Sequence, residues 1–429
     1  MKRFIKWALV TAMLVLPLLA AGSWSLQQWL GTEDFRIRAE TAIGTALGAK
    51  VTIERLEVAV WPLPGLVLEG IQTQTRPALT LQRVELRPAW RSLLLGRLEL
   101  ATVLVRGALL PQAGIDALLV LLEKRRLSAP PVEKPELEGG KRFQYVPRRT
   151  VLDKVTWVST QGTSSVLNAS AELNGQGLPE QVSVKVLKGL LQGARADLKR
   201  QGNDWTLAMA VGGGSVNGLF QLQPAAQAGA AFSLKGQLQT RGVEVAALSG
   251  AAQAVLSGKL DGDSTLSLRA ASVGALAESL QTQSTFTVRQ AQLHSIDLAK
   301  AVKTLGLSRG GETSLDVLAG QLTSHGRTLH LRHLAASSGV LSASGNATIA
   351  PSRALSGRID VNLAAAALGG AVGVPLVLGG TLDAPELTLT RAALVGAAIG
   401  TAVLPGVGTG AGVSLGDKVS SGLKKLFKP

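Results

Sequence analysis

The stretch Leu234-Lys235-Gly236-Gln237-Leu238 shows the pattern that decides the fold of this chain. Its two leucines and its glycine occupy alternate positions, so in a β-strand they share one face while Lys235 and Gln237 occupy the other. Similar residues repeat the pattern at 256–260, 318–322, 355–359 and 378–382. A glycine inside a strand weakens it unless the fold needs a bend or a close neighbour. The repeats therefore predict a curved sheet with an apolar concave face, and an ordinary sandwich with glycine kinks is the alternative.

The alternation extends through residues 151–390, where turn residues recur at short intervals. This spacing is typical of an antiparallel, all-β meander. An amphipathic sheet must bury its apolar face, either against a second sheet or by folding on itself like a taco around an apolar slot. Aromatic residues make up only 3% of the chain, and the abundant Ala, Gly and Leu suit a smooth, narrow lining. We therefore expect a long, curved β-groove.

The residues on the apolar side of these strands are the candidates for contact with a hydrocarbon guest. They are Phe232, Leu234, Gly236, Leu238, Leu256, Gly258, Leu260, Leu266, Leu268, Phe286, Val288, Leu318, Gly320, Leu322, Ile359 and Val361.

The composition narrows the class of partner. Hydrophobic residues make up 46% of the 429-residue chain, which excludes a disordered tail, and the net charge is +15. Such a charge favours anionic partners, and lipid headgroups fit better than nucleic acid because the basic residues are scattered without aromatic binding motifs. Cysteine is absent, and neither a Gly-x-Ser-x-Gly turn nor a phosphate loop occurs. We expect no enzyme, no cofactor and no metal.

The first thirty residues read as a membrane anchor. Lys2, Arg3 and Lys6 precede an uncharged run over about 7–26, which is roughly the 20 residues that cross a bilayer. The positive start predicts a cytoplasmic N-terminus. A signal peptide cleaved near Ala20-Ala21-Gly22 is the alternative. Either reading moves the bulk of the chain out of the cytoplasm.

Residues 31–127 predict a small α+β module. Thr32 is a candidate helix cap with acidic residues after it, and Gly48 is a candidate stop. The expected elements are a helix from 33 to 47, strands near 50–60, 66–73, 79–87 and 97–106, and a second helix over 112–127. The proline-rich, charged segment 128–150 is the candidate linker to the β-groove.

Several of these segments resemble the AsmA family. Leu47-Gly48-Ala49-Lys50-Val51-Thr52-Ile53 is similar to the family's helix-to-strand junction, and residues 61–71 and 93–100 are similar to its proline turn and its Leu-Leu-x-Gly-x-Leu-x-Leu signature. Residues 286–298 and 339–349 resemble its C-terminal half. A departure follows Leu109, where the family's Gly-x-x-Asn-Trp segment is missing. The resemblance implies a periplasmic β-groove tethered to the inner membrane, related to TamB and to bridge-like lipid-transfer proteins.

The tail, residues 391–429, begins with an uncharged, glycine-rich stretch and becomes helical in pattern from about Leu415. A basic amphipathic end of this kind can lie on an acidic membrane, either the inner membrane or a second one, or cap the open edge of the sheet. The candidate membrane-surface residues are Lys418, Leu423, Lys424, Lys425, Leu426, Phe427 and Lys428.

Together these features predict a single-pass inner-membrane protein whose periplasmic β-groove binds or conducts phospholipid or another envelope lipid, in support of outer-membrane biogenesis. The alternative is a periplasmic scaffold or chaperone whose groove edge pairs with strands of outer-membrane proteins.

Overall fold

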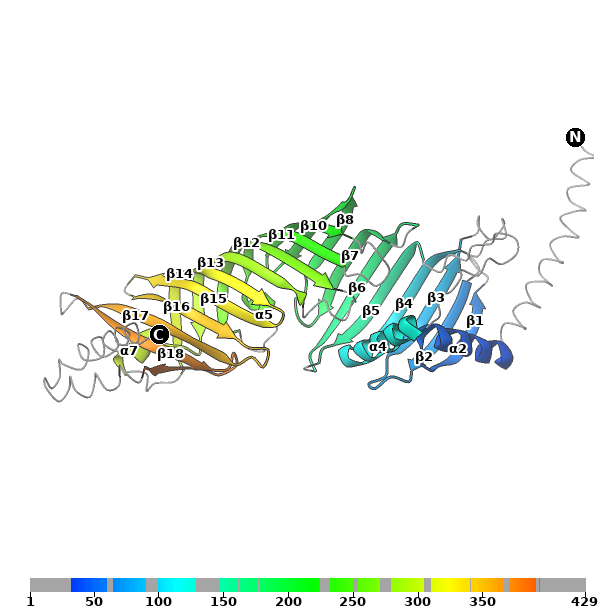
Figure 1. Cartoon of the computed structure of the whole chain (residues 1–429), viewed down its shortest axis with the longest axis horizontal. Coiled ribbons are helices and arrows are strands. Elements are labelled where there is room, and N and C mark those ends of the chain that lie inside the picture. The colour runs from blue at the N-terminus through cyan, green and yellow to red at the C-terminus, as the bar shows by residue number, and fades with distance from the viewer. Residues whose placement is uncertain are drawn as a thin grey trace, which may run out of the picture. The chain divides into compact units, whose positions relative to one another are not determined.

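The computed structural model describes residues 32–59, 65–89, 99–128, 147–160, 162–175, 178–223, 232–249, 254–270, 279–304, 310–339, 341–365, 370–390 and 393. Within these ranges the protein is mainly β, as predicted. Nineteen strands belong to one curved, mixed sheet (Figure 1). The chain divides into two compact units, unit 1 (Met1–Arg200) and unit 2 (Gln201–Pro429).

The described residues of unit 1 form two helices and eight strands, and each of these strands pairs with the next one along the chain. The elements are α2 (Glu33–Leu47), β1 (Val51–Ala59), β2 (Gly65–Thr73), β3 (Thr80–Pro88), β4 (Leu100–Pro111), α4 (Gln112–Ser128), β5 (Arg149–Val158), β6 (Ser164–Leu173), β7 (Pro179–Lys188) and β8 (Arg195–Gln201).

The two helices predicted within residues 31–127 are confirmed. Acidic Glu33 and Asp34 stand in the first turn of α2, and Gly48 ends it in the left-handed region at φ 70°. The predicted cap is wrong in detail, because the Thr32 side chain makes no capping hydrogen bond. Its backbone carbonyl instead accepts from the N–H of Arg36 at 3.2 Å.

Helix α2 packs on the apolar side of the sheet in unit 1 and also protects its edge. Phe35, Ala39 and Ile43 lie against the core that contains Ile53, which is 1% exposed. The backbone N–H of Ile53 in edge strand β1 donates to Glu40 Oε1 at 2.8 Å. Its carbonyl accepts from Arg36 Nη1 at 3.0 Å. The two side chains thus take the place of a neighbouring strand at this residue.

The antiparallel order fails at one pair in unit 1. Strand β5 runs parallel to β4, with Thr102 opposite Arg149. A helical crossover lets the chain re-enter a sheet in the same direction, and α4 follows β4 without a break. Most of the predicted linker, residues 129–146, lies outside the described residues, and its last residues begin β5.

The described residues of unit 2 form eleven strands and two short helices, and the strand pairs are antiparallel, as predicted for residues 151–390. The elements are β9 (Asp204–Val211), β10 (Gly214–Gln223), β11 (Phe232–Glu244), α5 (Ala246–Ser249), β12 (Leu256–Ala270), β13 (Gln281–His294), α7 (Leu298–Lys303), β14 (Glu312–His325), β15 (Thr328–Ser338), β16 (Leu341–Ile349), β17 (Leu355–Ala365), β18 (Gly370–Gly380) and β19 (Pro385–Leu389).

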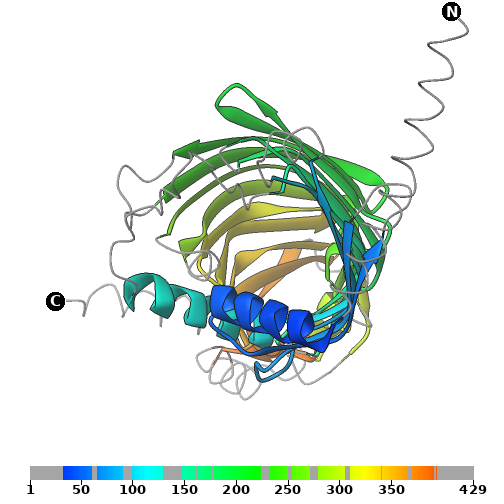
Figure 2. The ribbon, with the colours of Figure 1, turned by 90° about the vertical axis from the view of Figure 1, so that its right-hand side faces the viewer.

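The strands of unit 2, coloured green to orange in Figure 2, bend along their length. Gly258 has a φ of 127°, which favours glycine, and the β12–β13 register shifts between Ser257 and Lys259. Gly236 serves close approach, because a Cβ there would lie 2.6 Å from Cδ1 of Phe220. The fifth copy of the repeat departs from the prediction, since β18 ends at Gly380 inside it.

Two of the family-like segments lie at junctions between elements. Residues 47–53 lead from α2 into β1, and residues 286–298 lead from β13 into α7. Asp297 caps α7 by accepting from the N–H of Lys300 at 2.8 Å. The candidate anchor at 1–30, residues 61–64 and 93–98 and the candidate tail helix lie outside the described residues. None of the described helices is long and apolar enough to cross a membrane.

Candidate functional site

Strands β9–β14 of unit 2 sort their side chains onto two faces. Gly218, Leu238 and Ser264 lie opposite one another on neighbouring strands, and the row continues through Ser284 to Leu322. The adjacent row holds Leu219, Gln237, Thr265, Gln283 and Thr323 on the other face. We call these the apolar face and the polar face.

The apolar face carries no charged side chain at its described positions in β9–β14. Lys235 and Arg269 alternate with its leucines and so belong to the polar face. A group of its large side chains is only half-buried, and we call this group the open apolar surface. Its members are Leu207, Phe220, Leu234, Leu238, Leu266, Leu268 and Leu322.

The other part of the apolar side is a closed core. Val288 is 1% exposed and Val361 is 0% exposed, and Leu298 and Ala301 of α7 pack in the same cluster. Seven of the sequence candidates belong to this core or pack against it. They are Leu256, Leu260, Phe286, Val288, Leu318, Ile359 and Val361. The chain's own side chains fill the space here.

The other predicted lipid-lining residues fall into three groups, according to where the structure places them. Leu234, Leu238, Leu266, Leu268 and Leu322 belong to the open apolar surface. The three glycines make room for neighbouring atoms: Gly236 for Phe220, Gly258 for Val288, and Gly320 for Leu334 and Phe286. The side chain of Phe232 and the tail residues 418–428 lie outside the described part of the chain.

Hydroxyl groups interrupt the apolar face, and the sequence analysis missed them. Ser264 and Thr282 stand on β12 and β13, where the row positions predict apolar residues, and Ser284 Oγ donates to Ser264 Oγ at 2.7 Å. The signal was present in the sequence, because Ser264 and Ser284 each lie two residues from a predicted apolar position.

The polar face carries two shallow hollows, of about 990 and 480 Å³. Each of strands β11–β14 lends three consecutive residues to the larger one, for example Gln237, Leu238 and Gln239. The smaller one is bordered by Leu219 and Gln221, and Phe220 between them does not line it. Because side chains alternate, we infer that the outer two of each triplet project into the hollow and the middle one contributes backbone. Amide and hydroxyl side chains are frequent among the residues that line these hollows.

A row of polar side chains near the start of β12 has hydrogen-bond distances similar to those of a serine–histidine–carboxylate catalytic triad. Ser257 Oγ lies 3.0 Å from His294 Nε2, and His294 Nδ1 lies 3.2 Å from Glu312 Oε1. The Glu312 side chain is 59% exposed, however, and the N–H of Gly258 donates to Glu244 at 2.7 Å. The N–H of the residue after Ser257 is therefore already bonded and is not available as an oxyanion donor.

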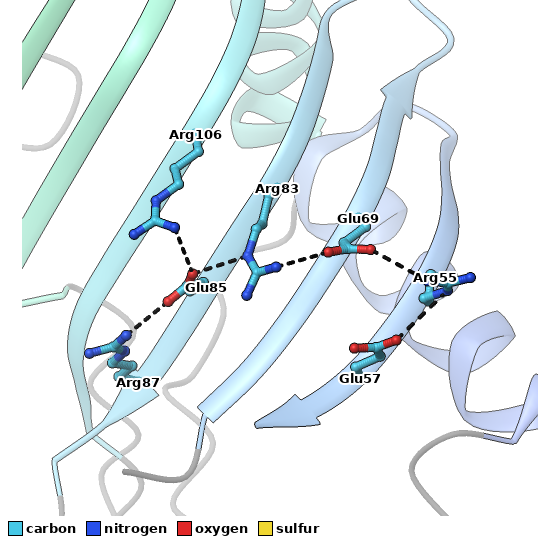
Figure 3. Close-up of polar contacts among 7 residues, drawn as sticks. All are labelled: Arg55, Glu57, Glu69, Arg83, Glu85, Arg87 and Arg106. Atoms are coloured by element: carbon cyan, nitrogen blue, oxygen red, sulfur yellow. Dashed lines mark hydrogen bonds and ion pairs between the residues drawn. The ribbon is translucent and has the colours of Figure 1, made fainter. Parts of the chain in front are cut away.

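In unit 1 a charged network crosses β1–β4 (Figure 3). Glu85, whose side chain is 9% exposed, contacts Arg83 at 3.0 Å, Arg87 at 2.9 Å and Arg106 at 3.7 Å. Burial alone would raise the pKa of Glu85, but hydrogen bonds from Arg87 and Arg83 and the charges of Arg83 and Arg106 lower it below its ordinary value. Glu69 continues the network from Arg83 towards β1. These carboxylates form ion pairs with the arginines and so connect neighbouring strands.

The fold and these two faces define a class: a mainly β protein with one curved, mixed sheet whose second unit has, among its described residues, a half-buried apolar surface over β9–β14. Within the described ranges, no group of three or more His, Asp or Glu side chains could hold a metal ion. Comparison of the chain with protein-family models, curated proteins and solved structures finds no match.

Proposed function

We propose that this chain is a membrane-anchored envelope protein that shields the acyl chains of phospholipid, or of another envelope lipid, on the open apolar surface of unit 2. The observation that carries the proposal is this half-buried, uncharged surface over β9–β14. Contiguous uncovered apolar surface is uncommon in proteins that act alone in water. The resemblance to AsmA proteins and the uncharged run at residues 7–26 support the envelope location.

The proposed driving force for lipid binding is the removal of hydrocarbon from water. Burying one methylene group gains about 0.8 kcal/mol, so a chain covered over ten methylenes gains roughly 8 kcal/mol before the costs of ordering it. In this proposal the curved sheet forms a taco-like groove whose apolar side receives the chains. The phosphate stays outside, because the surface offers no cation to a charged headgroup.

The alternative, a scaffold whose edge pairs with client strands, gains no support from β1. An added strand needs free backbone groups along the edge. The N–H and carbonyl of Ile53 are already bonded to Glu40 and Arg36.

Site-specific photo-crosslinking tests the proposal. The full chain would carry a photoreactive amino acid at Leu238 in one variant and at the neighbouring Gln237, on the polar face, in a matched variant. Irradiation in membranes followed by mass spectrometry should find lipid attached at position 238 and little at 237. Lipid captured equally at both positions, or at neither, would refute the proposal.

A further inference from the structure

A cluster of hydroxyl groups lies inside the otherwise apolar face of β12–β14. Ser264 and Ser284 are cross-strand partners, and so are Leu266 and Thr282 on the next row. Thr282 in turn lies opposite Ser324, which is 5% exposed. We call Ser264, Thr282 and Ser284 the hydroxyl patch.

The patch has hydrogen-bonding capacity beyond the bond between its two serines. Ser284 Oγ donates to Ser264 Oγ at 2.7 Å, so Ser264 accepts this bond and keeps its own hydroxyl hydrogen for an acceptor. Both serines and Thr282 are half-buried, which leaves them within reach of a ligand on the face. A hydroxyl in apolar surroundings is costly to leave without a partner, so a ligand that supplies an acceptor gains more here than on a wet surface.

The surroundings of the patch define the chemistry of that acceptor. The apolar face of β9–β14 has no charged side chain at its described positions, so nothing there compensates the charge of a phosphate or carboxylate. An uncharged acceptor attached to hydrocarbon fits both features. In a diacyl lipid that acceptor is the ester carbonyl oxygen at the head of each acyl chain.

We infer that the hydroxyl patch holds the ester carbonyls of a diacyl lipid, an assignment that rests on the proposed function. Ser264 and Thr282 donate to the carbonyl oxygens, and Ser284 orients Ser264. The acyl chains then extend over the flanking leucines, with Leu238 on one side of the serine pair and Leu322 on the other. The patch thereby fixes where along the face the glycerol end of the lipid rests.

Competition between two lipids with one headgroup tests the assignment. The full chain, purified in mild detergent, is incubated with equal amounts of ester-linked phosphatidylglycerol and its ether-linked dialkyl analogue, which lacks the carbonyls. Native mass spectrometry resolves the two bound forms. We expect the ester form to be favoured about fivefold, which corresponds to one net hydrogen bond.

Three variants make the test specific. Ser264→Ala with Ser284→Ala should bring the ratio close to one without loss of the ether form, and the isosteric Thr282→Val should lower the ratio independently. Thr265→Val with Thr285→Val alters the polar face of the same strands and should keep the wild-type ratio. Thermal melting of each variant verifies its folding.

The possible results separate the two proposals. Equal binding of ester and ether lipids by the wild type would overturn the hydroxyl assignment and leave the proposed function intact. An ester preference that survives in both hydroxyl variants would overturn the assignment as well. Failure of the wild type to bind either lipid would refute the proposed function itself.

Discussion

Replacement of Leu238 by asparagine separates lipid binding from folding. Leu238 lies half-buried on the open apolar surface, opposite Gly218 and Ser264. Asparagine has a similar size but would place an amide against the acyl chain. If the leucine covers two methylene groups of the lipid, the loss of binding free energy is about 1.6 kcal/mol, and the dissociation constant rises roughly 15-fold. Because the side chain is only half-buried, we expect the free energy of unfolding to fall by about 1 kcal/mol.

The matched control lies in the closed core of the same unit. Leu376 is 0% exposed, so Leu376→Ala should lower the free energy of unfolding by about 3 kcal/mol through cavity formation. It should leave the lipid dissociation constant unchanged at temperatures where the variant is folded. A second control, Gln237→Ala on the polar face, should change neither quantity by much.

Two measurements on the full chain decide the outcome. Titration with dioleoyl phosphatidylglycerol, followed by native mass spectrometry, gives the apparent dissociation constant. Chemical denaturation gives the free energy of unfolding. The reasoning is refuted if Leu238→Asn binds lipid as tightly as the wild type, or if folded Leu376→Ala is weakened to the same extent as Leu238→Asn.

Two further predictions concern unit 1. Glu85→Gln removes the carboxylate shared by Arg83, Arg87 and Arg106 and should cost about 2 kcal/mol at pH 7, measured by thermal melting. The pKa of Glu85 is lowered on folding, so the stabilisation by its carboxylate is complete above the ordinary value of 4.5 and disappears as the pH falls through the folded pKa. The melting temperatures of the wild type and the variant should therefore converge in acid. A difference that stays constant with pH would contradict the assignment. Glu40→Ala frees the N–H of Ile53 at the edge and should increase self-association in light scattering, whereas Glu33→Ala in the same helix should not.

Much of the local structure could be predicted from the sequence. Helix α2 ends at Gly48, and the strands of unit 2 alternate as their residues indicate. These features depend on neighbours a few residues apart, through caps, turns and side-chain periodicity. The parallel β4–β5 pair could not be predicted in this way, because it depends on the path of the chain through and beyond α4.

The candidate site was predictable only in part. Leu238 and Val361 carry the same signal, since each is an apolar residue that alternates with polar neighbours. The structure leaves Leu238 half-buried and places Val361 at 0% exposure. The difference comes from the core around α7, whose Leu298 and Ala301 cover one part of the apolar side and not the other.

The sequence by itself determined that the strands of unit 2 alternate apolar and polar residues, because alternation is a property of the extended backbone. Among the described residues, the tertiary structure alone decided which apolar side chains the protein's own core buries and which stay half-buried. That choice depends on contacts between segments far apart in the chain, such as α7 against β14 and β17, and no local pattern encodes them.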